Sequence, residues 1–402
     1  PWLDLCTAGL AFKFAHALLK ELRGENDSTA LATDIRETLD LVALGTIADL
    51  VSLTGENRIL ARKGLEKLQS VTRTGLAALF EVSGIETGQP VTPFDIAFRL
   101  SPRINASGRL ADAGMAVDML RGNDWTACLA TARELDRMNR ERQDIERGMA
   151  QQAMEIVDAE PPAPAIVLHS DKWHQGVAGI VASRLANHYH RPAIVLCTED
   201  GGLVKGSGRS AAGVSLTEAL AACTGHLETW GGHPMAVGVT LRAEKLTGFR
   251  KAFCAAVEGL LAGASREPSL EIAGWVNLDE LGDALFREID LLGPFGQGNP
   301  EPVFAIRGAK LSHPAASFGS GHCRFSIDCT GGNKLACVAW RAGERIPPCG
   351  RPIDIAARLT WNVWKGRRIP QLGVEDWRFS EPAGGAVPLR TESFAGQTRR
   401  LR

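Results

Sequence analysis

Residues 165–197, AIVLHSDKWHQGVAGIVASRLANHYHRPAIVLC, decide the fold class of this chain. The stretch begins and ends with short apolar runs, AIVLH and PAIVLC, which are typical of strands buried on both faces of a sheet. Residues 176–190 between them have the spacing of a helix. A strand, a helix and a second strand in close succession indicate a compact α/β domain.

The alternation continues downstream of this stretch. A strand, a helix, a second strand and a second helix are predicted at 203–210, 215–224, 235–241 and 243–261. Upstream, Pro161-Pro162-Ala163-Pro164 forms a linker, because proline cannot continue a helix. We therefore expect the α/β domain to occupy residues 163–262.

A long helix precedes this linker. Apolar residues recur at helical spacing through 126–157, and charged or amide side chains fill the other positions. About 30 helical residues span about 45 Å. We interpret residues 126–162 as a spacer between two lobes, with 1–125 forming the first lobe. Because the chain opens with Pro1 and reads at once as helix, we expect it to be a fragment of a longer protein.

The composition changes again after residue 268. A helix near 279–291 and the turn-rich GPFGQGNPEP (293–302) precede five short strand candidates, near 303–311, 322–328, 334–340, 353–360 and 369–376. Five short strands favour a small barrel with the OB-fold, which we place at 268–380. Residues 381–402 are interpreted as a tail.

The composition limits the possible functions. A chain of 402 residues suggests two or three domains. Its formal net charge is −1, so any binding of nucleic acid requires basic groups that are gathered locally. The nine cysteines contain no C-x-x-C pair, which favours free thiols in a reducing cytoplasm. No apolar run reaches the roughly 18 residues of a membrane span.

Three short motifs suit a polyanion. The first, PRINASGRL (102–110), is interpreted either as a loop that caps the next helix or as a phosphate cradle, because Arg forks match phosphate oxygens. KGSGRS (205–210) repeats this chemistry, and GGH (231–233) displays a histidine. Together they favour phosphate binding, with the candidate residues Arg103, Asn105, Ser107, Arg109, Lys205, Ser207, Arg209, Ser210 and His233.

Two further segments have alternative interpretations. In WHQGVAGIVASRL (173–185), a helix N-terminus would favour an anion, but the glycines are equally explained by close packing of the helix on the sheet. In RLTWNVWKGRRIPQL (358–372), tryptophans alternate with cations, as single-strand binding requires, and we select Trp361, Lys365 and Arg367. One tryptophan there could instead face the barrel core.

Asp49 is a lone carboxylate within LDLVALGTIADLVSL (39–53). It is either a helix cap or a metal ligand, because a buried carboxylate needs a partner or a cation. One aspartate cannot form a metal site, and residues 1–48 offer no paired acidic pattern.

These motifs, in this order, resemble the RecJ branch of the DHH phosphoesterase superfamily. The resemblance runs through GTIADL, NASGRL, the spacer helix, WHQGVAG, KGSGRS, GGHPMAVG and GPFGQGNPEP, and it covers roughly residues 5–378. It implies a single-strand-specific 5′→3′ DNA exonuclease of recombination and repair. The implied fold is α/β and multidomain, with the remainder of a DHH-type lobe (1–125), a DHHA1-type domain and an OB-like barrel.

The resemblance also implies residue roles. Asp49 would be the last acidic ligand of a two-metal cluster of Mn²⁺ or Mg²⁺. Arg109 would contact the DNA backbone, Ser207 and Arg209 would hold phosphate at the 5′ end, and His233 would lie near the scissile phosphate. Single-stranded DNA is the implied partner, with a single-strand-binding protein and a RecQ-type helicase as further candidates. A cytoplasmic monomer is expected.

The chain departs from the family pattern at its start. The family's earlier acidic motifs and its Asp-His-His triplet are absent from the 402 residues, so we expect the fragment alone to be inactive. Two alternatives remain open. One is an oligonucleotide or nucleotide phosphatase of the same superfamily, which the spacer and barrel disfavour. The other is a non-catalytic RecJ-like binding or scaffold protein, which the intact motifs disfavour.

Overall fold

The computed structural model describes residues 2–110, 112–261, 270–319, 321–343, 345–364 and 367–380. The chain divides into two compact units, each built from segments that are distant in sequence. The first unit comprises Pro1–Gln69, Pro90–Ile96 and Glu267–Arg402, and the second comprises Ser70–Gln89 and Ala97–Arg266. The expected first lobe, 1–125, is thus shared between the two units.

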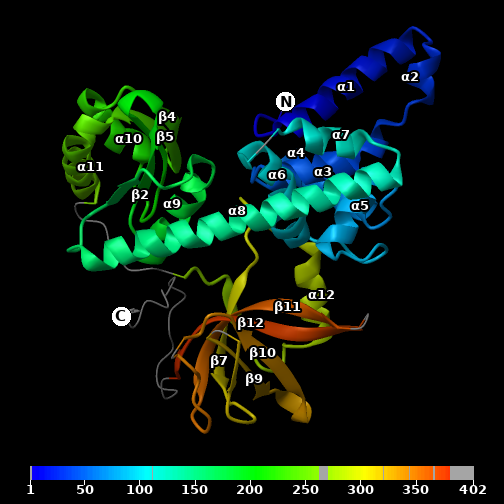
Figure 1. The fold of residues 1–402 in the computed structure, drawn as a ribbon. Helices are drawn as coiled ribbons and strands as arrows, with labels where there is room; N and C mark the ends of the chain where they lie inside the picture. Colours follow the sequence, from blue (N-terminus) through cyan, green and yellow to red (C-terminus); the bar gives the residue numbers. More distant parts are fainter. Residues whose placement is uncertain are drawn as a thin grey trace. The chain divides into compact units, whose positions relative to one another are not determined.

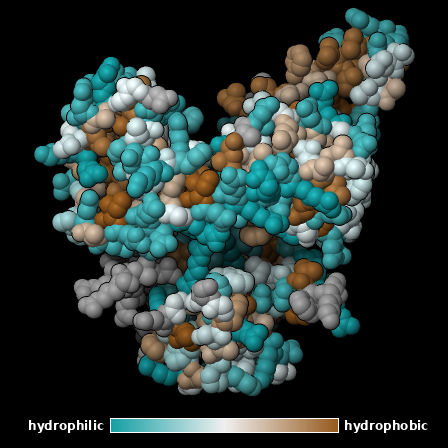
Figure 2. All heavy atoms as spheres, viewed as in Figure 1, coloured by the Kyte–Doolittle hydropathy of each residue, from teal (hydrophilic) through white to brown (hydrophobic). Residues whose placement is uncertain are grey.

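The first unit begins with four helices: α1 (Thr7–Gly24), α2 (Ser28–Ala32), α3 (Leu39–Ala48) and α4 (Gly55–Leu68). Helices α3 and α4 pack so closely that a Cβ atom at Gly64 would lie 2.1 Å from the carbonyl oxygen of Leu39. On α1, Leu10, Phe14 and Leu18 recur every four residues and are exposed, and Figure 2 shows a hydrophobic area over this helix.

The C-terminal part of the first unit contains helix α12 and one sheet (Figure 1). The strand order is β6-β7-β11-β12-β10-β9-β8. Leu311, just after β7, forms an isolated bridge with Ile327 of β9, so the sheet curls toward closure as in an OB barrel. The bounds are β6 (Gly274–Val276), α12 (Asp283–Leu291), β7 (Val303–Ala309), β8 (Ala316–Phe318), β9 (His322–Asp328), β10 (Lys334–Ala339), β11 (Ile353–Trp364) and β12 (Arg367–Phe379).

The barrel strands alternate between the core and the outer face. In β9, Cys323, Phe325 and Ile327 are buried, while Arg324 and Asp328 between and after them are exposed. The period of two matches a sheet that packs one face against a core and leaves the other in water. Sequence analysis expected five strands here, and the structure adds the three-residue strands β6 and β8, which are too short to show a pattern.

The second unit is organised along one long helix, α8, which spans Trp125–Ala159 and confirms the helix expected at 126–157. It begins where the Asp124 carboxylate accepts a hydrogen bond from the Ala127 N–H (2.8 Å). Helices α5 (Thr74–Ser83), α6 (Ser101–Leu110) and α7 (Gly114–Arg121) pack against α8, and so does α9 (Gln175–Tyr189) (Figure 1).

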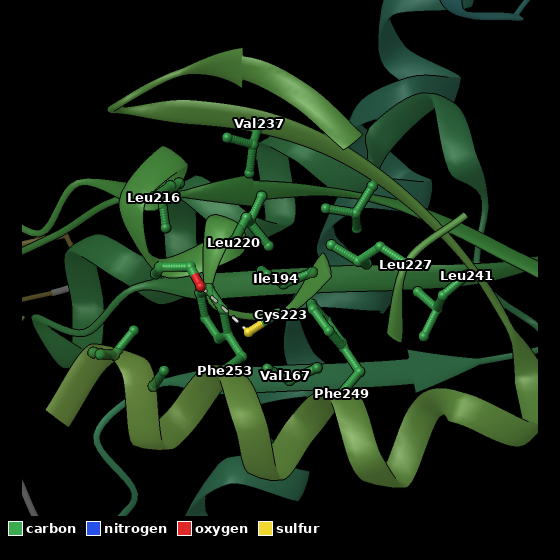
Figure 3. Close-up of a cluster of buried hydrophobic side chains, with 14 of the residues drawn as sticks. Val167, Ile194, Leu216, Leu220, Cys223, Leu227, Val237, Leu241, Phe249 and Phe253 are labelled. Carbon is green, nitrogen blue, oxygen red and sulfur yellow. Dashed lines mark hydrogen bonds between the residues drawn. The ribbon is translucent and has the colours of Figure 1, made fainter. Parts of the chain in front are cut away.

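A five-stranded sheet of order β1-β2-β3-β5-β4 forms the rest of this unit. Helix α9 covers one face at β2 and β3, and Figure 3 shows the opposite core, where Phe249 and Phe253 of α11 lie beside Val167 and below Ile194. The bounds are β1 (Ile166–Ser170), β2 (Ala193–Glu199), β3 (Leu203–Arg209), α10 (Leu216–Ala221), β4 (Thr229–His233), β5 (Ala236–Arg242) and α11 (Leu246–Leu260).

Replacing two helical glycines of this unit with alanine should change the free energy of unfolding in opposite directions. A Cβ atom at Gly75 of α5 would lie 1.9 Å from the Met119 carbonyl oxygen, whereas at Gly148 of α8 it would meet nothing within 4 Å. We expect Gly75→Ala to lower the free energy of unfolding by about 3 kcal/mol, because backbone atoms must move. Gly148→Ala should raise it by up to about 1 kcal/mol through helix propensity. Thermal denaturation followed by circular dichroism measures both, and equal melting temperatures for the two variants would contradict the close packing.

One expectation about local structure is wrong. Residues 102–110, for which one interpretation was a loop that caps the next helix, belong instead to helix α6, which follows a π-helical turn at Asp95–Leu100. The helical path is continuous from residue 93, so Pro102 lies inside it, directly after the π-helical turn, and Gly108 lies near its end. No helix among the described residues has both the length and the apolar composition that a membrane span needs.

Candidate nucleic-acid interface

Helices α6 and α9 meet at the start of α9. The Arg109 guanidinium, at the end of α6, donates to the Gly176 carbonyl oxygen (2.9 Å), and the His174 side chain caps α9 by accepting from the Gly176 N–H (3.0 Å). A Cβ atom at Gly176 would lie 2.7 Å from the Arg109 carbonyl oxygen. The absence of a side chain at Gly176 is therefore what lets α6 reach the N-terminus of α9.

The same helix meets β3 one turn later. A Cβ atom at Gly179 would lie 2.9 Å from the Arg209 guanidinium and 3.4 Å from the Ser207 Cβ atom. The glycines of this segment therefore permit close packing of α9 on the sheet. The side chain that packs against Gly179 is Arg209, which is itself a candidate phosphate ligand, so the packing and anion-binding interpretations concern the same place.

Three guanidinium groups gather in this region, on Arg109, Arg142 and Arg209. Burial and the nearby Arg109 both lower the pKa of Arg209. For Arg142, burial lowers the pKa more than Glu146 raises it, and Arg109 lowers it further. Burial thus disfavours the charged forms of Arg142 and Arg209, and an anion bound beside them would offset part of that cost.

Arg142 was not selected from the sequence. It projects from α8, where its guanidinium contacts Glu146 (3.1 Å) and the Asn139 side-chain oxygen (3.1 Å). Its Nε atom is buried and has no hydrogen-bond partner among the described residues. A sequence signal existed, because Arg142 occupies a position in the apolar stripe of α8 between Met138 and Ile145.

The register of β3, β5 and β4 builds a ledge beside these arginines, on the face that α9 covers only in part. The central row of the ledge is Ser207, Gly238 and Gly231. A Cβ atom at either glycine would meet nothing within 4 Å, so the centre is open. Polar and cationic rows flank it, namely Arg209, Ala236 and His233 on one side and Lys205, Thr240 and Thr229 on the other.

The other predicted residues of this unit have varied surroundings. Arg103 forms an ion pair with Asp136 of α8 (2.9 Å), and Lys205 lies 3.8 Å from Glu199. The Ser107 hydroxyl donates to the Ile104 carbonyl (2.8 Å), and the Ser210 hydroxyl donates to the Val214 carbonyl. Asn105 and His233 are exposed. Because α6 is a helix, Arg103 and Arg109 point in different directions, and Arg103 faces α8.

Asp49 belongs to the first unit and is the C-cap residue of α3. Its side chain is exposed, so the premise that this carboxylate is buried is wrong. Across the described residues there is no group of three or more His, Cys, Asp or Glu side chains that could hold a metal ion. The residues present therefore do not fit a two-metal cluster on their own.

The segment just after Asp49 is fastened to the loop that follows α12. The Leu53 N–H donates to the Gln297 carbonyl (2.7 Å), and the Arg58 guanidinium donates to the Leu292 carbonyl (2.6 Å). Gly298 has a φ of +71°, and a Cβ atom there would lie 2.1 Å from the Ser52 hydroxyl. We call these contacts between residues 52–58 and 292–298 the clasp. It explains Gly298 and also Gly296, where a Cβ atom would lie 2.7 Å from the Leu53 side chain, in a segment that sequence analysis described only as turn-rich.

Of the three residues selected on the β11–β12 hairpin, two are described. The Trp361 ring packs against Phe286 of α12 (centroids 5.5 Å apart), and the Arg368 guanidinium lies 4.6 Å from its centroid. Arg367 is exposed at the start of β12. Lys365 lies outside the described residues. The interpretation that one tryptophan of this hairpin packs on the core applies to Trp361, which contacts the barrel cluster.

The chain combines a DHHA1 domain with an OB-type barrel, and this pair of domains defines the class of protein to which it belongs. The DHHA1 domain profile matches residues 142–259, and the RecJ OB domain profile matches residues 272–376. The chain belongs to the RecJ family of single-stranded-DNA-specific exonucleases. It is 37% identical to the RecJ exonuclease of Bacillus subtilis over 95% of its length, and 33% identical to that of Haemophilus influenzae over 93%.

Solved structures agree with this assignment. The Thermus thermophilus RecJ structure in complex with Mg²⁺ superposes with a TM-score of 0.74 at 33% identity, over 88% of this chain and 54% of that one. The same protein in complex with Mn²⁺ gives 0.72. The predicted α/β multidomain fold, with DHHA1-type and OB-type domains, is confirmed. The chain spans 47% of the Bacillus relative and 68% of the Haemophilus relative.

Proposed function

We propose that this chain is the strand-holding part of a single-strand-specific 5′→3′ DNA exonuclease that acts in recombination and repair. The observation that carries the proposal is the group of Arg109, Arg142 and Arg209 beside an open ledge, in a chain of the RecJ family. Guanidinium forks suit phosphate oxygens, and a terminal phosphate would stabilise the guanidinium groups whose charged forms burial disfavours.

The open ledge gives the part of the strand that follows the terminal phosphate a surface on which to lie. A strand backbone can lie over Gly238 and Gly231 because no side chain rises there, with Ser207 and His233 at hand as hydrogen-bonding groups. The arginines would recognise the 5′ end through its extra negative charge, which internal phosphates lack. Recognition of one end in this manner gives a nuclease its polarity.

Metal chemistry belongs to the proposal for the whole protein. Bound Mn²⁺ or Mg²⁺ would supply an activated water and stabilise the leaving oxygen. Asp49 is the one ligand predicted in this chain, and the described residues hold no group of side chains that could bind a metal, so we expect the chain alone to bind but not to cleave. The resemblance extends the proposal to a cytoplasmic monomer that works with a single-strand-binding protein and a RecQ-type helicase.

A comparison of two proteins tests the proposal. The first is this chain, and the second is this chain extended at its N-terminus with the corresponding part of the Bacillus subtilis relative. We expect both to bind single-stranded DNA and only the extended protein to degrade 5′-phosphorylated strands with Mn²⁺, measured on 3′-labelled oligonucleotides. If both bind and neither cleaves, the binding or scaffold alternative holds. If neither binds, the strand-holding role itself is wrong.

A further inference from the structure

The buried face of α8 contains a polar stripe in its middle. Asp136, Asn139 and Arg142 follow one another at intervals of three residues and are 7%, 3% and 9% exposed, whereas the other buried residues of this helix are apolar. Buried charged groups often stabilise a fold less than apolar side chains of similar volume would. Positions at which a sequence departs from simple packing rules are often functional, so the stripe points to a task beyond packing.

Glu146 extends this stripe by one turn and connects α8 with α9, which packs against it (Figure 1). Its side chain is 15% exposed. One carboxylate oxygen accepts a hydrogen bond from Nη1 of Arg142 (3.1 Å), and the other lies 3.7 Å from the guanidinium of Arg184 on α9. The Asn139 side-chain oxygen accepts from Nη2 of Arg142 (3.1 Å). Both terminal nitrogens of Arg142 are therefore held by side chains of its own helix.

The order of the two charges argues against a role in stabilising α8. A carboxylate placed four residues before a cation stabilises a helix better than the reverse order, because it lies nearer the positive end of the helix dipole. Here Arg142 precedes Glu146. Glu146 instead supplies a countercharge inside the protein: burial lowers the pKa of Arg142, Glu146 raises it, and Arg109 lowers it further. The carboxylate thus favours the charged form of a buried guanidinium that lies near a second one.

We propose that Glu146 is a positioning residue for the 5′ end, which fixes the Arg142 guanidinium in the orientation that meets a terminal phosphate together with Arg109 and Arg209. This inference rests on the proposed function and deepens it, since it names a residue that prepares the same site. A guanidinium that is already held in place loses less conformational freedom when the ligand binds, so the affinity is higher. Glu146 acts through Arg142 and does not touch the strand.

The negative charge of Glu146 has a second effect of opposite sign. A carboxylate near a phosphate site repels the ligand, and it repels a terminal dianion more than an internal phosphate with one charge. We define the 5′-phosphate preference as the ratio of the affinities for the phosphorylated and hydroxyl forms of one oligonucleotide. Loss of positioning lowers this preference, whereas loss of repulsion alone raises it.

Glu146→Gln tests the proposal, because glutamine keeps the length of the side chain and removes its charge. We expect the 5′-phosphate preference to fall by about 3- to 10-fold, as a charged hydrogen-bonding group loses its fixed orientation. The affinity for the 5′-hydroxyl strand should stay the same or rise. Anisotropy titrations of the 402-residue chain at one salt concentration measure both affinities. A preference that rises would show that Glu146 only repels the strand, and would overturn the proposal.

Arg184→Gln is the matched control. It removes the ion pair between α8 and α9 and leaves the hydrogen bond between Arg142 and Glu146 in place, so the preference should change by less than about twofold. If Arg184→Gln and Glu146→Gln lower the preference equally, Glu146 serves to join the two helices and the positioning role is wrong.

A double-mutant cycle identifies the residue through which Glu146 acts. In a chain that carries Arg142→Ala, the added Glu146→Gln change should leave the preference as it is, because the group to be positioned is gone. A further fall in that background would contradict the proposal. If Glu146→Gln does not fold, as judged by circular dichroism, Glu146→Asp replaces it. Aspartate keeps the charge but withdraws the carboxylate from Arg142, so an unchanged preference in that variant would also contradict the proposal.

The outcomes separate this inference from the proposed function. If the wild-type chain binds the phosphorylated and hydroxyl strands equally, recognition of the 5′ end fails first, and Glu146 has no such site to prepare. If Arg209→Ala removes the preference while Glu146→Gln leaves it unchanged, recognition of the 5′ end stands and the positioning role of Glu146 is wrong.

Discussion

Arg209→Ala should reduce the affinity of this chain for a 5′-phosphorylated oligonucleotide by about 10- to 100-fold, and should reduce its affinity for the 5′-hydroxyl form much less. Hydrogen bonds to a charged group contribute about 1.5–3 kcal/mol, which corresponds to that range. The 5′-hydroxyl strand lacks the terminal dianion, so its binding affinity should fall less when Arg209 is replaced. Anisotropy titrations with the two oligonucleotides measure the difference.

The same substitution should not destabilise the free protein. Burial and the neighbouring Arg109 lower the pKa of Arg209, which means that the fold disfavours its charged form. Replacing it with a neutral side chain relieves that cost, so the melting temperature should stay the same or rise. Binding residues commonly trade stability for function in this manner.

Arg209→Lys is the matched control. It keeps the charge but loses the planar fork, so it should recover only part of the 5′-phosphate preference. Equal losses on the phosphorylated and hydroxyl strands would contradict a role at the 5′ end and would assign Arg209 to general contact with the backbone.

Gly238→Val should have the second large effect, by filling the centre of the ledge. A valine there would stand between Ser207 of β3 and Gly231 of β4, where the wild-type chain has open space. We expect binding of 5′-phosphorylated and 5′-hydroxyl strands to fall together, each by about 10-fold or more, because a backbone held away from the sheet loses several charged contacts. The same titrations measure this.

The melting temperature of the Gly238→Val variant shows whether a loss of binding comes from a blocked ledge or from a destabilised fold. The backbone of Gly238 is an ordinary strand conformation, and no atom lies within 4 Å of the new Cβ, so valine should leave the melting temperature unchanged or raise it. Gly238→Ala, with a single methyl group, should give an intermediate loss of affinity. A valine variant that binds like the wild type would show that the strand does not cross this ledge.

Much of the second unit could be predicted from sequence because its elements have strong periodic signals. The apolar runs of β1 and β2 are buried on both faces, and the helical stripe of α8 extends over 35 residues. The motifs around Arg109, Ser207 and Arg209 were also recognisable, since Arg and Gly together in a short segment suit phosphate. Such signals are local, and local signals can be read from one sequence.

Other features depended on contacts between distant segments. Nothing local shows that Arg142 of α8 joins Arg109 and Arg209, or that Trp361 is covered while Trp340 is exposed. Helix α6 was missed because Pro102 and Gly108 resemble turn residues, although Pro102 directly follows a π-helical turn and Gly108 lies near the end of the helix. For Asp49 the sequence left a helix cap and a metal ligand open; the residue is the C-cap of α3 and is exposed, which agrees with the helix-cap alternative.

The clasp has a consequence for anyone who recombines this protein with its relatives. A chimera made by exchanging the OB barrel at residue 268 would carry Gln297 and Gly298 from one parent and Ser52, Leu53 and Arg58 from the other. A larger residue opposite Ser52, or a loop shifted by one position, would leave the Leu53 N–H and the Leu292 carbonyl without their partners. The barrel and residues 52–58 should therefore be exchanged together. Chimeras that take both from one parent should keep the contacts of the clasp, whereas chimeras that take the barrel alone should lose them.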